Sequence, residues 1–460
     1  PNGGRNPKWK NKGKTLTWLS ANVFHEASIE ALFKNNNKDT KKEVIKLKIV
    51  KTNYKKVIAL TNARIISMKR HEVIENGTII IEGNRIKDIG TNSDVTIPKN
   101  AFIQNCEGKT IIPGLIDMHM HAIPPNHTLK QNWWSYLASL SYGVTTMRDP
   151  SNFRNFAYEE RIKSGDMTAP RLYGATATGS PFINIANYED ALALVRQYKN
   201  MGATFFKTHN SWPRYKRQWM VKAARQENLN ITGHYSGENV YGGFNMSILQ
   251  DGFGGVEHTI WGDYAVYDDV KQLVAKSGIW YTPTFQYSSF SVVDNESEIA
   301  NDPRVLKFNY FLNEKIQKYL SKVDRKNQLE KKEFLTIMGK DAKDMLKHGA
   351  KVSIGSHGNY PGLGMHWAMQ ILQLGGFTPY EALQSATIVA AEGLGMQKEL
   401  GSLEVGKLAD LIILDKNPLE DLKNTLLINH VMVDGKLYKA NSLDMVWPVK
   451  KNLPVFRRKE

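Results

Sequence analysis

Cysteine is nearly absent from this chain of 460 residues, which contains Cys106 alone. A single cysteine excludes an internal disulfide and a metal site built on cysteine. Long apolar runs are also missing, so no segment is expected to span a membrane. The apolar fraction is still 41%, which is enough to bury a sizeable core and excludes a chain disordered throughout.

Acidic residues are in deficit: 45 Asp and Glu stand against 61 Lys and Arg, for a net charge of +16. An excess of this size is typical of proteins that bind nucleic acid or a membrane surface. The lysines, however, are scattered or gather in polar segments such as Lys41–Lys56 and Lys322–Lys332. No zinc-finger, RRM-like or helix-turn-helix signature accompanies them. A solvated basic surface is therefore favoured, and no nucleic-acid partner is expected.

The chain changes character along its length. Residues 1–56 are polar, and Asn6–Trp9 with Lys14–Trp18 are predicted to form a β-hairpin remnant, similar to the last strands of a propeller blade. Residues 57–112 and 398–445 are β-rich, with Asn-Gly and Gly-Asn turns in the first of these segments, and predict one small β-sandwich domain assembled from both flanks.

The middle of the chain, residues 113–397, alternates short apolar strands with amphipathic helices. This alternation predicts an α/β fold, a (β/α)8 TIM barrel. A polar stretch near 286–333 is too long for one connecting helix and predicts a helical insertion. The expected strands are Thr110–Ile116, Thr145–Arg148, Arg171–Ala175, Thr204–Lys207, Asn230–His234, Gly255–His258, Trp280–Pro283 and Lys351–Gly355.

Histidines mark the end of the first expected barrel strand. His119 and His121 follow it two residues apart, and residues i and i+2 of an extended chain point to the same face. Active sites of these barrels form at the carboxyl ends of the strands. The spacing alone is weak, because two histidines so placed arise by chance in many proteins.

Further possible ligands close other expected strands: Lys207, His234, His258 and His357. Each has an ordinary structural interpretation alone, such as a histidine satisfied by its neighbours. Five imidazoles and a lysine at one rim are harder to explain in that way, and they suit a divalent cation.

Three long motifs resemble one known family. They are Gly114–His121, Gly143–Asp149 and Gly401–Leu411, within a similarity that spans roughly 57–440. The sequence is similar to the amidohydrolase superfamily, in its imidazolonepropionase-like and Xaa-Pro-dipeptidase-like branch, and resembles the hydrolase part of propeller-fused members.

The resemblance implies a site for one or two divalent metal ions, usually zinc. It places His119 and His121 on one ion and His234 and His258 on the other, with Lys207 N6-carboxylated as a bridging carbamate. The implied activity is hydrolysis, by a metal-activated water, of an amide or other C–N bond in a peptide-like or cyclic amide substrate.

The sequence departs from the family pattern in two places. His357 stands where the superfamily usually has an aspartate, so it is expected to act as a base or a ligand at a site with one less negative charge. Ala368 stands where propeller-fused relatives tend to have a glutamate, which is expected to weaken turnover. A metal-binding but catalytically silent scaffold therefore stays open as an alternative.

The substrate is expected to be a small molecule or a short peptide. Candidate binding residues are Arg148, Arg214, Tyr235 and His366, and His209 also lies in sequence near the rim; for Arg148, a structural ion pair with Asp149 is as good an interpretation. A homo-oligomer and a β-propeller partner or domain at the N-terminus are further expectations. A periplasmic or secreted location is favoured over a cytoplasmic one.

Overall fold

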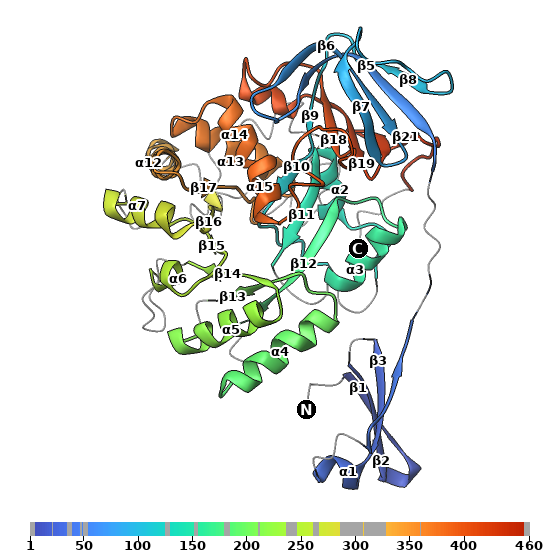
Figure 1. Ribbon diagram of the computed structural model, residues 1–460, viewed down its shortest axis with the longest axis vertical. Helices are drawn as coiled ribbons and strands as arrows, with labels where there is room; N and C mark the ends of the chain where they lie inside the picture. Colours follow the sequence, from blue (N-terminus) through green and yellow to red (C-terminus); the bar gives the residue numbers. More distant parts are fainter. Residues whose placement is uncertain are drawn as a thin grey trace.

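The computed structural model (Figure 1) describes residues 5–20, 22–34, 39–46, 48, 54–124, 129–150, 155–178, 185–209, 212–235, 246–260, 266–285, 307, 328–358 and 360–454. Within these ranges, no helix is both long enough and apolar enough to cross a membrane. The cysteine, Cys106, is buried.

The middle of the chain forms an eight-stranded parallel sheet whose strands follow one another in sequence order, which is the arrangement of a TIM barrel. Met118 N donates to Ile354 O at 3.1 Å, and this bond joins the end of the first strand to the segment after the last. The strands are β10 (Leu115–Asp117), β11 (Val144–Asp149), β12 (Arg171–Thr178), β13 (Phe205–Thr208), β14 (Asn230–His234), β15 (Gly255–Glu257), β16 (Trp280–Thr282) and β17 (Lys351–Val352).

Helices lie between and after these strands, and their ends carry the usual local signals. Asn187 caps one helix by accepting from Asp190 N, and Thr378 forms a capping box with Glu381 on another. The helices are α2 (Trp134–Ser141), α3 (Asn155–Ser164), α4 (Tyr188–Asn200), α5 (Arg214–Gln226), α6 (Ser247–Gln250), α7 (Asp268–Ser277), α12 (Gln328–Lys347), α13 (Leu363–Leu374), α14 (Pro379–Ser385) and α15 (Ile388–Gly393).

A nine-stranded sheet joins the two β-rich flanks and lies at the top of the molecule in Figure 1. Strand β18 pairs with both β9 and β19, so the flanks meet inside one sheet. The strands are β5 (Val57–Ile66), β6 (Val73–Glu82), β7 (Arg85–Thr91), β8 (Phe102–Asn105), β9 (Thr110–Pro113), β18 (Leu411–Leu414), β19 (Ile428–Val433), β20 (Lys436–Lys439) and β21 (Met445–Trp447).

The strand predicted over Thr110–Ile116 was wrong as a single element. Residues Thr110–Pro113 belong to the nine-stranded sheet, and the barrel begins only at Leu115. The break falls at Gly114, where a Cβ would lie 2.1 Å from Thr145 Oγ1. The chain passes between the two sheets at a point where only glycine fits. The Pro113-Gly114 dipeptide inside the apolar run was the signal in the sequence for this break.

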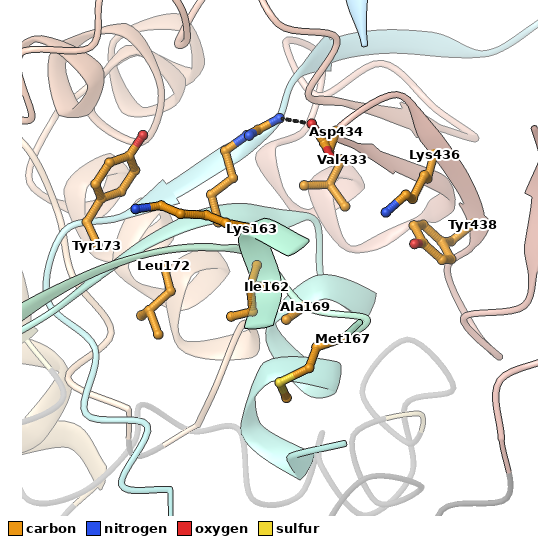
Figure 2. Close-up of a pocket in the computed structure, with 11 residues that line it drawn as sticks. Ile162, Lys163, Met167, Ala169, Leu172, Tyr173, Val433, Asp434, Lys436 and Tyr438 are labelled. Carbon is orange, nitrogen blue, oxygen red and sulfur yellow. Dashed lines mark hydrogen bonds and ion pairs between the residues drawn. The ribbon is translucent and has the colours of Figure 1, made fainter. Parts of the chain in front are cut away.

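A partly buried ion-pair network ties the barrel to the nine-stranded sheet. Arg171 Nε, at the start of β12, lies 2.7 Å from Asp410 Oδ2, and its Nη2 lies 3.1 Å from Asp434 Oδ1. Figure 2 shows the cavity beside this network, lined also by Lys163, Lys436 and several apolar side chains. Because Arg171 begins its strand, this cavity lies at the end of β12 opposite the one where a barrel active site is expected.

The N-terminal region is larger than the predicted hairpin. Antiparallel strands β1 (Arg5–Lys10) and β2 (Thr15–Ser20) form that hairpin, and β3 (Val23–Ser28) and β4 (Lys41–Val44) extend it to four strands, with α1 (Ile29–Phe33) between them. Figure 1 places this sheet apart from the barrel. The predicted insertion near 286–333 lies outside the described residues except for Lys307 and the beginning of α12.

Candidate metal centre

His119 and His121 follow β10, where the chain leaves the barrel. Their Nε2 atoms lie 3.1 Å apart. Asp117 fixes the backbone of this segment, because its buried carboxylate accepts hydrogen bonds from His119 N at 3.1 Å and from Ser356 N at 3.0 Å. The pair therefore points to one place, as the spacing of two residues predicted.

Lys207, His258 and His234 approach the same place from three neighbouring strands. Lys207 Nζ lies 3.1 Å from His119 Nε2 and 3.3 Å from His258 Nε2. His258 Nε2 is in turn 3.0 Å from His234 Nδ1. Lys207 thus stands between the two histidine pairs, because its Nζ lies close to one imidazole of each pair.

His357 completes the group from the loop after β17. One nitrogen each of His119, His121 and His357 could hold a metal ion, since these three atoms lie within 4.8 Å of one another. Glycines permit this approach: a Cβ on Gly355 would lie 2.5 Å from His119 Cβ, and one on Gly358 would lie 2.7 Å from His121 O. These two glycines therefore allow the segment Gly355–Gly358 to pack directly against His119 and His121.

Two of these histidines have left-handed backbone conformations, with φ of 74° at His258 and 59° at His357. Such conformations are uncommon outside glycine and cluster at functional sites, where surrounding structure holds them in place. Here they turn both imidazoles toward His119, whose ring centroid is 4.6 Å from that of His258 and 5.3 Å from that of His357.

Burial favours the uncharged form of the nitrogen donors. It lowers the pKa of His119, His121, His234 and His258 well below the usual value for histidine, and it lowers the pKa of Lys207 to about 7. Neutral nitrogen donors are what a divalent cation requires. A set dominated by imidazoles fits zinc better than magnesium or calcium, which prefer oxygen.

Known proteins share this architecture. The model of the Amidohydrolase family matches residues 110–438, more than half of the chain. The chain belongs to the amidohydrolase family.

Relatives of this amidohydrolase include the imidazolonepropionase of Shouchella clausii (strain KSM-K16), 23% identical over 79% of this chain and 86% of that protein. The ochratoxinase of Aspergillus niger is 22% identical over 80% of this chain and 84% of that protein. The structure of a Xaa-Pro dipeptidase with bound methionine superimposes with a TM-score of 0.62 at 22% identity, over 84% of this chain and all of that one.

The comparisons confirm the predicted superfamily and branch. The amidohydrolase is an enzyme of the hydrolase class that acts on C–N bonds, and members of its family usually bind divalent metals. The histidine triad described above is a candidate for that metal.

Sequence reasoning missed Glu257, which is the partner of Arg148 in the structure. The Glu257 carboxylate is fully buried, lies 2.6 Å from His119 Nδ1 through Oε2, and pairs with Arg148 Nη2 through Oε1. The side chain of Arg148 is 3% exposed, and its Nε donates to Met118 O. These contacts favour the structural interpretation of Arg148, and its role in substrate binding stays a prediction. The signal available in the sequence was the position of Glu257 directly before the ligand candidate His258.

His366 makes packing contacts inside the fold, and its role in substrate binding stays a prediction. It is fully buried in α13, with Nδ1 2.8 Å from Thr425 Oγ1 and Nε2 2.9 Å from Tyr142 O. Both ring nitrogens are thus used in holding α13 to its neighbours. Ala368, one residue beyond Trp367, is likewise fully buried in the hydrophobic core, where a glutamate would need a buried partner.

The remaining candidate binding residues lie in three different surroundings. Arg214 pairs with Asp251 at 2.7 Å, so its cation is already matched by a carboxylate. Tyr235 is half-buried after His234, and its role stays a prediction. His209 does lie beside the site, with its ring 4.5 Å from that of His234.

Acidification should destabilise the metal-free amidohydrolase. The four site histidines with depressed pKa stay neutral in the folded state, whereas in the unfolded chain they take up protons below about pH 6.5. Each therefore removes up to about 1.4 kcal/mol of stability per pH unit as the pH falls below that value. We expect urea unfolding of the metal-free protein to show lower stability at pH 6 than at pH 8, and the reverse order would contradict the assignment of neutral, buried imidazoles.

We expect the substitution Gly358→Ala to weaken zinc binding in addition to lowering the stability of the fold. Gly358 has φ of 85° and no room beside His121, whereas Gly349 has φ of 96° and open space around it. Both alanine variants should lose about 1–2 kcal/mol from the left-handed backbone. Only Gly358→Ala should also push the His357 loop from His121 and weaken zinc binding, measured by competition with a chelator. Equal zinc affinity in the two variants would show that this close approach does not matter.

Proposed function

We propose that the chain is a metal-dependent amidohydrolase that hydrolyses the amide or other C–N bond of a peptide-like or cyclic amide substrate. The observation that carries the proposal is the convergence of five imidazoles and the Lys207 amine at the carboxyl end of the barrel strands. A closed (β/α)8 barrel with the nine-stranded sheet as its β-sandwich domain is the scaffold of this proposal.

In this proposal His119 and His121 bind one ion, His234 and His258 bind the other, and the preferred ion is zinc. One nitrogen of His357 lies within 4.8 Å of one nitrogen each of His119 and His121, which is close enough for all three to bind one ion and favours a ligand role over one as a distant base. An ion held by these residues would supply Lewis-acid polarisation of a carbonyl and would lower the pKa of a bound water.

Lys207 is proposed to bridge the ions after carboxylation. With a pKa of about 7, its amine is largely uncharged at slightly alkaline pH, so its lone pair can add to CO2, forming an N–C bond with release of one proton. The resulting carbamate would replace a repelling ammonium by two anionic oxygens. Its position between the two histidine pairs supports this role.

The substrate class is proposed from the relatives. Names such as imidazolonepropionase and Xaa-Pro dipeptidase favour a cyclic amide or a dipeptide for this chain as well. The preference for a substrate bearing a carboxylate loses support, because Arg148 is buried and Arg214 is paired. The proposed periplasmic or secreted location, the homo-oligomer and the N-terminal propeller partner stay predictions.

The test compares chelated and zinc-reconstituted protein on a panel of Xaa-Pro and other dipeptides, N-acyl amino acids and small cyclic amides. We expect hydrolysis that chelation removes and zinc restores, and that His121→Ala abolishes. His348→Ala is the matched control, because His348 lies at the surface paired with Asp268. Tight zinc binding without turnover on any substrate would favour the silent scaffold instead.

A further inference from the structure

The buried carboxylate of Glu257 contacts Nδ1 of His119, the ring nitrogen that does not face His121 and Lys207. Glu257 contributes Oε2 to His119 Nδ1 at 2.6 Å and Oε1 to the guanidinium of Arg148. Arg148 also donates its Nε to Met118 O at 2.6 Å, one residue before His119. The backbone before His119 and its ring are therefore tied to the same two side chains.

This arrangement decides which nitrogen of His119 carries the proton. A carboxylate only accepts hydrogen bonds, so the nitrogen that faces it must carry the hydrogen when the ring is neutral. The hydrogen then resides on Nδ1, and Nε2 keeps a lone pair. Nε2 is the atom that faces His121 Nε2 and Lys207 Nζ, at 3.1 Å in both cases.

We propose that Glu257, locked by Arg148, is a positioning residue that holds His119 in the tautomer whose Nε2 binds the metal, and that Arg148 acts through Glu257 and not on the substrate. Partners of this kind fix ring orientation and raise the basicity of a metal-bound histidine. The inference rests on the proposed function for the metal itself, but the tautomer is a property of the metal-free protein.

The role of Arg148 makes the proposal specific. In Glu257→Gln the side chain keeps its shape but offers one acceptor oxygen and one donor NH2. Arg148 carries only donors and requires the oxygen, so the NH2 is left facing His119 Nδ1. Nδ1 must then accept, and the ring hydrogen moves to Nε2 without any net gain or loss of a proton. The lone pair that faces the metal is removed.

A second substitution should reverse this effect. In Glu257→Gln combined with Arg148→Met, the donors that claim the amide oxygen are gone. The glutamine amide can turn its oxygen toward Nδ1, which restores the original tautomer. A purely structural role of the ion pair predicts the opposite, because the double variant loses more of the pair than the single one does.

The experiment reads ring nitrogens directly, by long-range proton–nitrogen NMR of metal-free protein labelled with 15N-histidine. We expect His119 to be protonated on Nδ1 in the unsubstituted chain, on Nε2 in Glu257→Gln, and on Nδ1 again in the double variant. Zinc affinity, measured by chelator competition, should fall about 10- to 100-fold in the single variant and recover in the double variant.

Glu159→Gln is the matched control, since Glu159 is also a buried glutamate in an ion pair, with Lys163 on α3. It should change neither the tautomer nor zinc affinity. Protonation of His119 on Nε2 in the unsubstituted protein overturns the proposal, even if a variant fails to fold. An unchanged tautomer in Glu257→Gln, or no recovery in the double variant, overturns it as well. Absence of zinc binding by the unsubstituted chain would instead defeat the proposed function.

Discussion

Replacement of Lys207 by alanine is expected to lower bound zinc from two equivalents to one or fewer and to slow hydrolysis by about a thousandfold, or about 4 kcal/mol in the barrier. The reason is position: Lys207 Nζ lies within 3.3 Å of ligand nitrogens from both histidine pairs. Removing it removes the only proposed group shared by the two ions. Elemental analysis after dialysis, paired with initial rates, measures both effects.

The carbamate makes this prediction depend on CO2. Zinc loading of the unsubstituted chain should be faster and more complete with bicarbonate present, whereas loading of Lys207→Ala should be indifferent to it. Lys222→Ala serves as control, because Lys222 lies on α5 against the ring of Tyr188, on the outside of the barrel. Zinc content that does not respond to Lys207→Ala would rule out the bridge.

Replacement of His357 by asparagine is expected to weaken zinc binding about 10- to 100-fold and to reduce hydrolysis by at least as much. Asparagine is chosen because it tolerates the left-handed backbone that His357 adopts, with φ of 59°, better than alanine does. The loss then reports on the imidazole and not on strain. Chelator competition and kcat, measured on the same preparation, separate metal loss from slower chemistry.

The substitution His357→Asp distinguishes a ligand from a base. Aspartate also accepts this backbone and supplies a metal-binding oxygen, so it should retain zinc and a substantial part of the activity if His357 is a ligand. Full zinc affinity in His357→Asn together with complete loss of turnover would instead assign His357 to proton transfer. Unchanged affinity and unchanged rate would exclude both roles.

The sequence alone predicted the barrel and the ends of its strands. Alternation of buried parallel strands with helices is a local pattern, and it placed His119, Lys207, His234 and His258 where the structure has them. Carboxyl ends of parallel strands meet at one rim, so residues distant in sequence can be assigned to one site without knowing the contacts. His357 followed from the same argument.

The positions of strand ends could not predict which side chains contact one another inside the barrel. Arg148 and Glu257 pair across non-adjacent strands, and neither periodicity nor spacing reports which buried side chains face one another. His366 was predicted to bind substrate, but the sequence could not show that it lies in α13 with hydrogen-bond partners for both ring nitrogens. Residue type and position along a strand are properties of the chain, whereas hydrogen-bond partners depend on side-chain packing.

What the sequence determined about this protein is therefore its family, its barrel and the rim of possible ligands, because these follow from local periodicity and from where strands end. The tertiary structure alone decided the break at Gly114, the close approach of Gly358 to His121, and the Glu257–Arg148 pair behind His119. Each of these depends on distances between segments far apart in the chain, which only the packed fold defines.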